Sequence, residues 1–237
     1  MNYFLSIIIA LDTRVENFFY AFRDLEWVKF FTWVTLLAKW QMITSLTLTV
    51  ILIFWFWKKK SYIIPLSVAL AGSGLFNLIA KLAFHRARPE TALYAESSFS
   101  FPSGHSTIAV VFFGFIIYVL MRGRLKLKHK ISILFFGAVL ILLVGLSRLY
   151  LGVHFLSDVL GGYILGLFWL VAGIVIAERL NSKNKISLQG PSREVKILSA
   201  FLIFIQIAFY AGFVLNYDPP INKTTKLPED ISKKNLE

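Results

Sequence analysis

The sequence contains no cysteine and few charged residues. Without cysteine, the chain has no disulfide, no thiolate metal site and no cysteine nucleophile. Only 16% of its 237 residues are Asp, Glu, Lys or Arg, whereas a soluble domain of this size usually carries about 25%. Hydrophobic residues make up 57% of the chain. The shortage of charge therefore indicates a membrane protein.

Acidic residues are the scarcer of the two kinds of charge. The chain has 13 Asp and Glu against 25 Lys and Arg, which gives a formal net charge of +12. A protein that binds nucleic acid would gather its basic residues on a polar surface. Here the basic residues lie between apolar runs instead, so we expect a lipid bilayer and no nucleic acid as the partner.

Six stretches lack Asp, Glu, Lys and Arg and have roughly the length of a membrane-spanning helix, about 17–25 residues. They are Gln41–Trp57, Tyr62–Ala80, Phe101–Met121, Ile131–Ser147, Val159–Ala177 and Ile197–Leu215. Six such stretches in succession predict an all-α, polytopic transmembrane helix bundle with about six spans. Residues 41–180 are expected to form its catalytic core.

The two ends of the chain differ from this core. Residues 1–40 mix charged residues with Phe18, Phe19, Tyr20 and Phe22, a composition typical of one or two helices that lie in the membrane interface. Residues 181–237 are expected to form a cytoplasmic loop, an extra transmembrane helix and a polar, mobile tail.

The basic residues are unevenly distributed among the connecting loops. Lys58–Lys60, Arg122–Lys130 and Glu178–Lys196 hold 13 of the 25 Lys and Arg and only two acidic residues. Because short cytoplasmic loops carry an excess of Lys and Arg, we expect these three segments to be cytoplasmic. The opposite ends of the helices then face the extracytoplasmic side.

Three groups of polar residues fall at these opposite ends. Lys81, Arg88 and Arg148 offer three positive charges, which suit a phosphate monoester of about −1.5 to −2 charge. Lys81 and Arg88 are seven residues apart and would share one face of a helix. Ser103 and Gly104 stand where a helix is expected to start, and helix N-termini bind anions. These five residues are the predicted phosphate-binding set.

Two histidines and one carboxylate complete the predicted site. His154 and Asp158 are four residues apart, so on one helix face they could hydrogen-bond. A carboxylate that holds one imidazole nitrogen orients the other as a nucleophile or base, while His105 could protonate a departing oxygen. Each residue alone has an ordinary structural explanation, but their convergence on one side favours a site. His85 and Arg86 lack this support and are interpreted as interface residues.

The three groups resemble the motifs of the type 2 phosphatidic acid phosphatase superfamily, in particular its bacterial membrane lipid phosphatases. Lys81, Arg88 and Pro89 match the first motif, Pro102 to His105 the second, and Ser147, Arg148, His154 and Asp158 the third. The resemblance covers about residues 12–180, and no motif position departs from the pattern.

This resemblance implies a role for each residue. His154 would attack phosphorus to form a phosphohistidine, Asp158 would orient it, and His105 would protonate the leaving group. It also implies that no cofactor or divalent metal is needed, and the outer cluster has too few carboxylates for a Mg²⁺ site. The expected substrate is a membrane lipid phosphate: undecaprenyl pyrophosphate, phosphatidylglycerol phosphate or phosphatidic acid.

Two features lie outside the family pattern. Bacterial members usually have a full transmembrane helix before the segment that begins here near Leu11, and Ile197–Leu215 is an added span. Either the chain is truncated at its N-terminus, or the last helix takes the place of the missing one.

Two other functions remain open at this point. A lipid phosphotransferase would pass the same phosphohistidine to another lipid instead of to water. An anion channel or transporter could also use basic residues, but it needs no nucleophile, and the sequence shows no internal repeat. The sequence does not indicate an oligomeric state.

Overall fold

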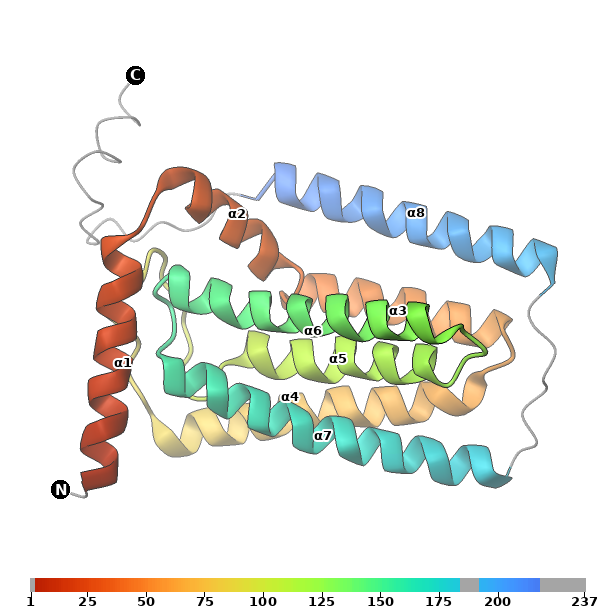
Figure 1. Cartoon of the computed structure of the whole chain (residues 1–237), viewed down its shortest axis with the longest axis horizontal. Helices are drawn as coiled ribbons and strands as arrows, with labels where there is room; N and C mark the ends of the chain where they lie inside the picture. Colours follow the sequence, from red (N-terminus) through yellow and green to blue (C-terminus); the bar gives the residue numbers. More distant parts are fainter. Residues whose placement is uncertain (1–2, 184–191, 218–237) are drawn as a thin grey trace.

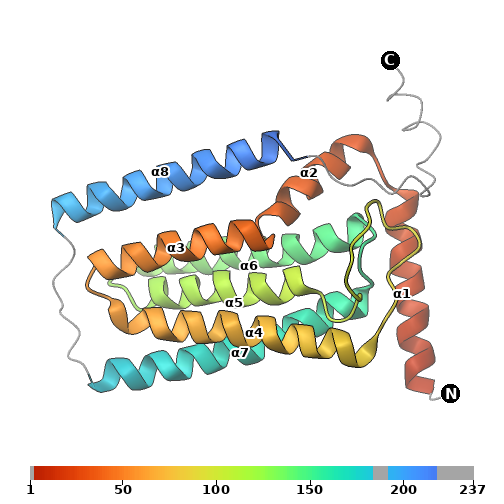
Figure 2. The same ribbon diagram turned by 180° about the vertical axis from the view of Figure 1, so that it is seen from behind.

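The computed structural model describes residues 3–183 and 192–217. Within these ranges the chain forms α-helices and one short 3-10 helix, Lys60–Tyr62. The α-helices are α1 (Tyr3–Ala21), α2 (Leu25–Leu36), α3 (Trp40–Phe56), α4 (Ile63–Phe84), α5 (Gly104–Met121), α6 (Leu127–Tyr150), α7 (Leu156–Lys183) and α8 (Arg193–Leu215). Helices α3 to α8 run along the long axis of the molecule, whereas α1 lies across one end of the bundle (Figures 1 and 2).

The helices confirm the predicted all-α membrane bundle. In the described residues, five helices are long and apolar enough to cross a membrane, and the pair α2 and α3, bent by 46°, makes a possible sixth span. Their outward surfaces are apolar: Phe136, Ile164 and Phe204 are each about two-thirds exposed or more, at 68%, 70% and 66%. Lipid tails can cover such a surface, because every backbone polar group of a helix is satisfied internally.

The first forty residues differ in part from the interfacial segment that was predicted. Helix α1 lies across the bundle end, as an interfacial helix would (Figure 1). Helix α2 instead runs into the bundle and packs against α6, burying Phe31, Val34 and Leu36. Arg23, Asp24, Glu26 and Lys29 interrupt the apolar run here, so the sequence pattern revealed only α3 of this bent pair.

Helix α5 lies at the centre of the bundle and packs closely against α7. Phe112 and Phe115 of α5 belong to a buried cluster that also includes Leu66 of α4. At the site end, a side chain on Gly162 of α7 would come within 2.6 Å of the Ser103 carbonyl oxygen. Glycine at this position therefore permits the close packing of α7 against the start of α5.

The basic segments and the polar motifs lie at opposite ends of the bundle. The α3–α4 and α5–α6 connections lie at one end, together with the end of α7 and the start of α8, and the segment between α4 and α5 lies at the other end with α1 (Figure 1). This separation agrees with the helix order on which the charge argument rested. The predicted tail, from residue 218 onward, and residues 184–191 of the predicted loop lie outside the described residues.

Candidate active site

Helix α4 ends before Arg88, the second basic residue of the first motif. His85 ends α4 in a left-handed backbone conformation with φ of 46°. Arg88 therefore does not share a helix face with Lys81, contrary to our expectation. It lies in an extended stretch that folds back over the site, where its Nη1 donates to the Val153 carbonyl oxygen at 2.7 Å and its Nε to that of Ser98 at 2.8 Å.

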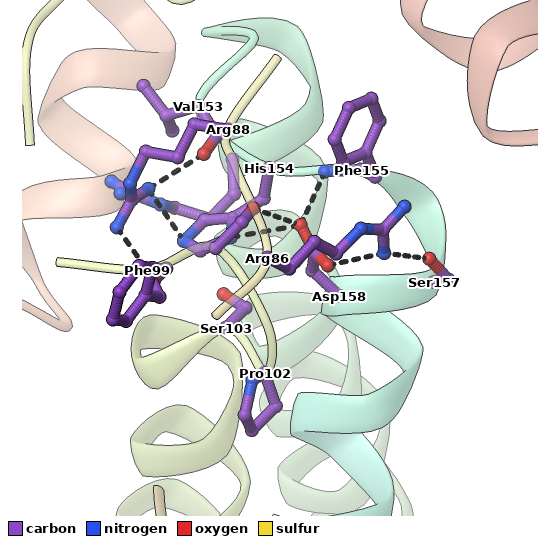
Figure 3. A network of polar contacts seen from close by, with 12 residues as sticks. Arg86, Arg88, Phe99, Pro102, Ser103, Val153, His154, Phe155, Ser157 and Asp158 are labelled. Carbon is purple, nitrogen blue, oxygen red and sulfur yellow. Dashed lines mark hydrogen bonds and ion pairs between the residues drawn. The ribbon is translucent and has the colours of Figure 1, made fainter. Parts of the chain in front are cut away.

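The predicted histidine–aspartate pair is present, but not on one helix. His154 lies in the turn before α7, and Asp158 in the first turn of α7. The two side chains meet because Asp158 points back: its Oδ2 lies 3.4 Å from His154 Nδ1 and accepts the Phe155 backbone N–H at 2.9 Å (Figure 3). The Ser100 hydroxyl donates to the same oxygen and lies 3.3 Å from Nδ1. A proton held on Nδ1 in this way leaves the lone pair of Nε2 free to act as a nucleophile.

The predicted cations surround this imidazole. Arg88 Nη1 lies 3.2 Å from His154 Nε2. Lys81, nearly buried, donates from Nζ to the Phe99 carbonyl oxygen. Arg148 is fully buried on α6 and donates to the hydroxyl oxygen of Tyr94 at 2.8 Å. The structure thus brings three cations from two helices and a loop to one end of the bundle.

The start of α5 supplies the remaining predicted residues. Ser103 is the N-cap of α5: its hydroxyl oxygen accepts from Ser106 Oγ at 3.0 Å, and its own O–H remains available as a donor. A side chain on Gly104 would only touch Asn77, with the nearest atom at 3.4 Å, so the packing of the protein alone does not require glycine here. Gly104, His105 and Arg148 line one cavity.

Four polar residues of the site were not identified from the sequence. Glu96 pairs with Arg148 at 2.5 Å and lies 3.5 Å from Arg88, so it joins two of the predicted phosphate-binding cations. Ser100 contacts the histidine–aspartate pair. Arg86, interpreted as an interface residue, forms an ion pair with Asp158 at 2.7 Å and another with Asp12 at 2.7 Å. Only the position of Glu96, Ser100 and Arg86 near the first two motifs could have indicated them; Asp12 gave no signal.

The electrostatics of the site favour a neutral His154 and an ionised Glu96. Burial, followed by the charges of Arg148, Arg88 and Lys81, lowers the pKa of His154 well below its usual value. Burial alone would raise the pKa of Glu96, but Arg148 and the other nearby basic groups outweigh it and lower that pKa to about 2. A neutral imidazole keeps the lone pair that nucleophilic attack requires.

A cavity of about 860 Å³ opens beside these residues. One part of its wall is polar and includes Glu96, His105 and Arg148. Much of the rest is apolar and comes from α3 and α4, including Ile43, Leu48, Leu70 and Ala71. The cavity therefore joins Arg148, one of the predicted phosphate-binding cations, to a space between helices that suits an alkyl chain.

In residues 3–183 and 192–217, no three His, Asp or Glu side chains come together in a way that could hold a metal ion. Metal independence stays a prediction of the resemblance.

The chain is similar to known membrane phosphatases. Residues 62–182 match the PAP2 superfamily. Phosphatidylglycerophosphatase B of Bacillus subtilis is 50% identical over 103 residues, which cover 42% of this chain and 51% of that protein, so the match spans about half the length of this curated relative.

Two solved structures share the fold. The structure described as the first transmembrane PAP2 type phosphatidylglycerolphosphate phosphatase from Bacillus subtilis superimposes with a TM-score of 0.67 at 32% identity, covering 73% of this chain and 87% of that one. LpxE of Aquifex aeolicus superimposes with a TM-score of 0.55 at 26% identity, covering 71% of this chain and 95% of that one. The chain belongs to the PAP2 superfamily.

Proposed function

We propose that the chain is an integral membrane phosphatase that hydrolyses a lipid phosphate ester through a phosphohistidine on His154. One observation carries the proposal: an imidazole whose Nδ1 faces a buried carboxylate turns its Nε2 towards Arg88, 3.2 Å away. A nucleophile, an orienting acid and phosphate-binding cations are what this reaction needs. The names of the Bacillus relatives, both phosphatases, support it.

The reaction takes place in two steps. His154 Nε2 attacks phosphorus, the bond from phosphorus to the lipid oxygen breaks, and His105 gives a proton to that oxygen. Water then attacks phosphorus, His105 takes one of its protons, and the nitrogen–phosphorus bond breaks to return neutral His154 and inorganic phosphate. Lys81, Arg88 and Arg148 stabilise the charge on the phosphoryl oxygens throughout.

The start of α5 completes the phosphate site. Ser103 can donate its hydroxyl, and Gly104 lets a phosphate oxygen approach the first backbone N–H groups of α5. A side chain at position 104 would meet only Asn77 within the protein, so glycine there would serve the approach of the ligand and not the packing of the protein.

The cavity supports a lipid as the substrate. Its polar end reaches His105 and Arg148, and its apolar walls lie between α3 and α4, where an acyl or isoprenyl chain would fit. Phosphatidylglycerol phosphate is the candidate that the names of the Bacillus relatives favour. Undecaprenyl pyrophosphate and phosphatidic acid present the same terminal phosphate. Because the basic loops lie at the opposite end of the bundle, we place the site on the extracytoplasmic side.

Phosphate release from these three lipids by the purified protein in detergent tests the proposal. Without added metal, the wild-type protein should release phosphate from at least one of them, and His154→Ala should release none. His129→Ala is the matched control, because His129 lies on α6 at the basic end of the bundle. An acid-labile, base-stable phosphoryl group should be trapped on the wild-type protein and on His129→Ala, but not on His154→Ala.

Two results would contradict the proposal. Steady-state release by His154→Ala at a rate near that of the wild type would remove His154 as the nucleophile. Transfer of the trapped phosphoryl group to an added lipid alcohol, with no free phosphate, would show a phosphotransferase.

A further inference from the structure

Helix α1 presents one buried acid to the rest of the molecule. Among the described side chains of α1, Asp12 is the only one that is buried, with 3% of its surface exposed. The helix lies across the end of the bundle that carries the site (Figure 1). Because aspartate is rarely buried unless it is paired, Asp12 must have partners that offset the loss of hydration.

The first partner of Asp12 is the start of α7. Its Oδ1 accepts the Ser157 backbone N–H at 2.9 Å, and its Oδ2 accepts the Ser157 hydroxyl at 2.6 Å. Backbone N–H groups in the first turn of a helix lack a partner within that helix, so an acid there acts as a cap and interacts favourably with the helix dipole. Asp12 of α1 therefore caps α7 at Ser157, the residue that precedes Asp158.

The second partner is Arg86, which connects Asp12 to the acid of the active site. Its Nη2 donates to Asp12 Oδ2 at 2.7 Å, and its Nη1 donates to Asp158 Oδ1 at 2.7 Å (Figure 3 shows the latter). Its guanidinium lies over the Phe155 ring, 4.4 Å from the centroid. The two oxygens of Asp158 are thus divided: Oδ1 binds Arg86, and Oδ2 faces His154.

We propose that Asp12 and Arg86 are positioning residues that hold the Asp158 carboxylate in the orientation His154 needs, so that α1 is a working part of the active site. The inference rests on the proposed function, since it assumes that His154 is the nucleophile. Arg86 contacts Asp158 directly, and Asp12 reaches Asp158 only through Arg86 and Ser157, so both act through Asp158.

The opposite charges of Asp12 and Arg86 make the proposal testable by pH. The positive charge of Arg86 disfavours a protonated His154, and the negative charge of Asp12 offsets that effect. The other titratable or charged groups around His154 stay the same in every variant: Lys81 of α4, Arg88 and Glu96 of the α4–α5 segment, His105 of α5, Arg148 of α6 and Asp158 of α7. Differences between variants therefore report the two substituted groups.

The experiment measures kcat, KM and the pH dependence of kcat/KM for Asp12→Asn, Arg86→Gln and Arg86→Lys. Loss of a group directly behind a reacting residue typically costs about 10- to 100-fold in activity. We expect kcat to fall on that order in Asp12→Asn and Arg86→Gln, with KM nearly unchanged. The acidic limb of the profile should move to lower pH in Asp12→Asn and to higher pH in Arg86→Gln, each by about half a pH unit or more.

Arg86→Lys and a control variant on α1 separate positioning from general loss of structure. Arg86→Lys keeps the positive charge, so its acidic limb should stay at the wild-type position even if kcat falls. Glu16→Gln is the matched control on α1, because Glu16 Oε1 accepts the Thr91 hydroxyl at 2.9 Å and so docks the same helix without contact to Arg86 or Asp158. It should keep wild-type kcat and an unchanged pH profile.

The results distinguish failure of this inference from failure of the proposed function. If the wild type releases phosphate and His154→Ala does not, the function stands. If Asp12→Asn and Arg86→Gln then shift the acidic limb in the same direction, or match Glu16→Gln in kcat, the positioning role is wrong. Should Asp12→Asn fail to fold, the opposed behaviour of Arg86→Gln and Arg86→Lys decides the question. A wild type without activity on any lipid phosphate would refute the proposed function itself.

Discussion

Replacing Asp158 by asparagine should change the protonation of His154 and not merely weaken a contact. The Asp158 carboxylate is fully buried and faces four donors: Arg86 at Oδ1, and Ser100, the Phe155 N–H and His154 at Oδ2. An asparagine has one acceptor oxygen and one NH₂ group. Because Arg86 is positively charged as well as a donor, the asparagine oxygen should stay on its side, and the NH₂ group should face His154 and the Phe155 N–H.

The consequence for His154 is a change of tautomer. With a donor opposite Nδ1, the imidazole lowers its energy by moving its proton to Nε2, and the nucleophilic lone pair is lost. In Ser-His-Asp enzymes the equivalent substitution lowers kcat by about 10⁴ through the wrong tautomer. We expect kcat of Asp158→Asn to fall by on the order of 10³ or more, and the free energy of unfolding by about 1–3 kcal/mol, because a buried donor is left without an acceptor.

Asp158→Ala provides the comparison that isolates the tautomer. Alanine removes the orienting acid but places no donor against Nδ1, so the imidazole is free to adopt either tautomer. Per molecule of folded protein, Asp158→Ala should therefore be at least as active as Asp158→Asn, although it should be less stable. Phosphate release and thermal unfolding in detergent measure the two quantities. Asparagine at this position with more than about one-third of the wild-type kcat would refute the reasoning.

Three further predictions concern the metal, the buried arginine and the orientation. Activity should survive EDTA, and vanadate should inhibit by occupying the phosphate site; loss in EDTA with rescue by Mg²⁺ would contradict this. Arg148→Gln should abolish turnover and lower the free energy of unfolding by about 3–5 kcal/mol, since it removes one partner of the ion pair with Glu96; an unfolding curve like that of the wild type would count against it. A cysteine at the exposed Ser97 should react with a membrane-impermeant maleimide in intact cells, and one at the exposed Lys126 only after permeabilisation; the reverse pattern would place the site in the cytoplasm.

The span positions could be predicted from the sequence because the bilayer imposes a simple rule. Runs of about 20 apolar residues are needed wherever a helix crosses lipid, and α4 to α8 each contain one. The rule fails at α2, where Asp24, Glu26 and Lys29 begin a helix that is apolar only in its second half. Its apolar face is covered by α6, a tertiary contact that no local pattern indicates.

The sequence predicted which residues come together at the site better than it predicted the local backbone that carries them. Lys81 and Arg88 were expected on one helix, and so were His154 and Asp158. In both cases a helix boundary falls between the two residues: His85 ends α4, and α7 begins after His154. Spacing of seven or four residues is compatible with a helix, but a helix end allows side chains to meet by folding back. The pairs come together at the site even though the reason given for their proximity was wrong.

The residues that support the site were invisible in the sequence for a different reason. Asp12 lies 74 residues before Arg86, and Arg86 lies 72 residues before Asp158. Such a chain of contacts has no period and depends on α1 lying across the start of α7. In the proposed function the motif residues meet the substrate, so phosphate chemistry would set their identities. Asp12 meets only other protein groups, and its identity is set by a fold that must first bring three distant segments together. This difference explains why a search for chemistry finds His154 at once, while the acid that holds its partner in place becomes apparent only in three dimensions.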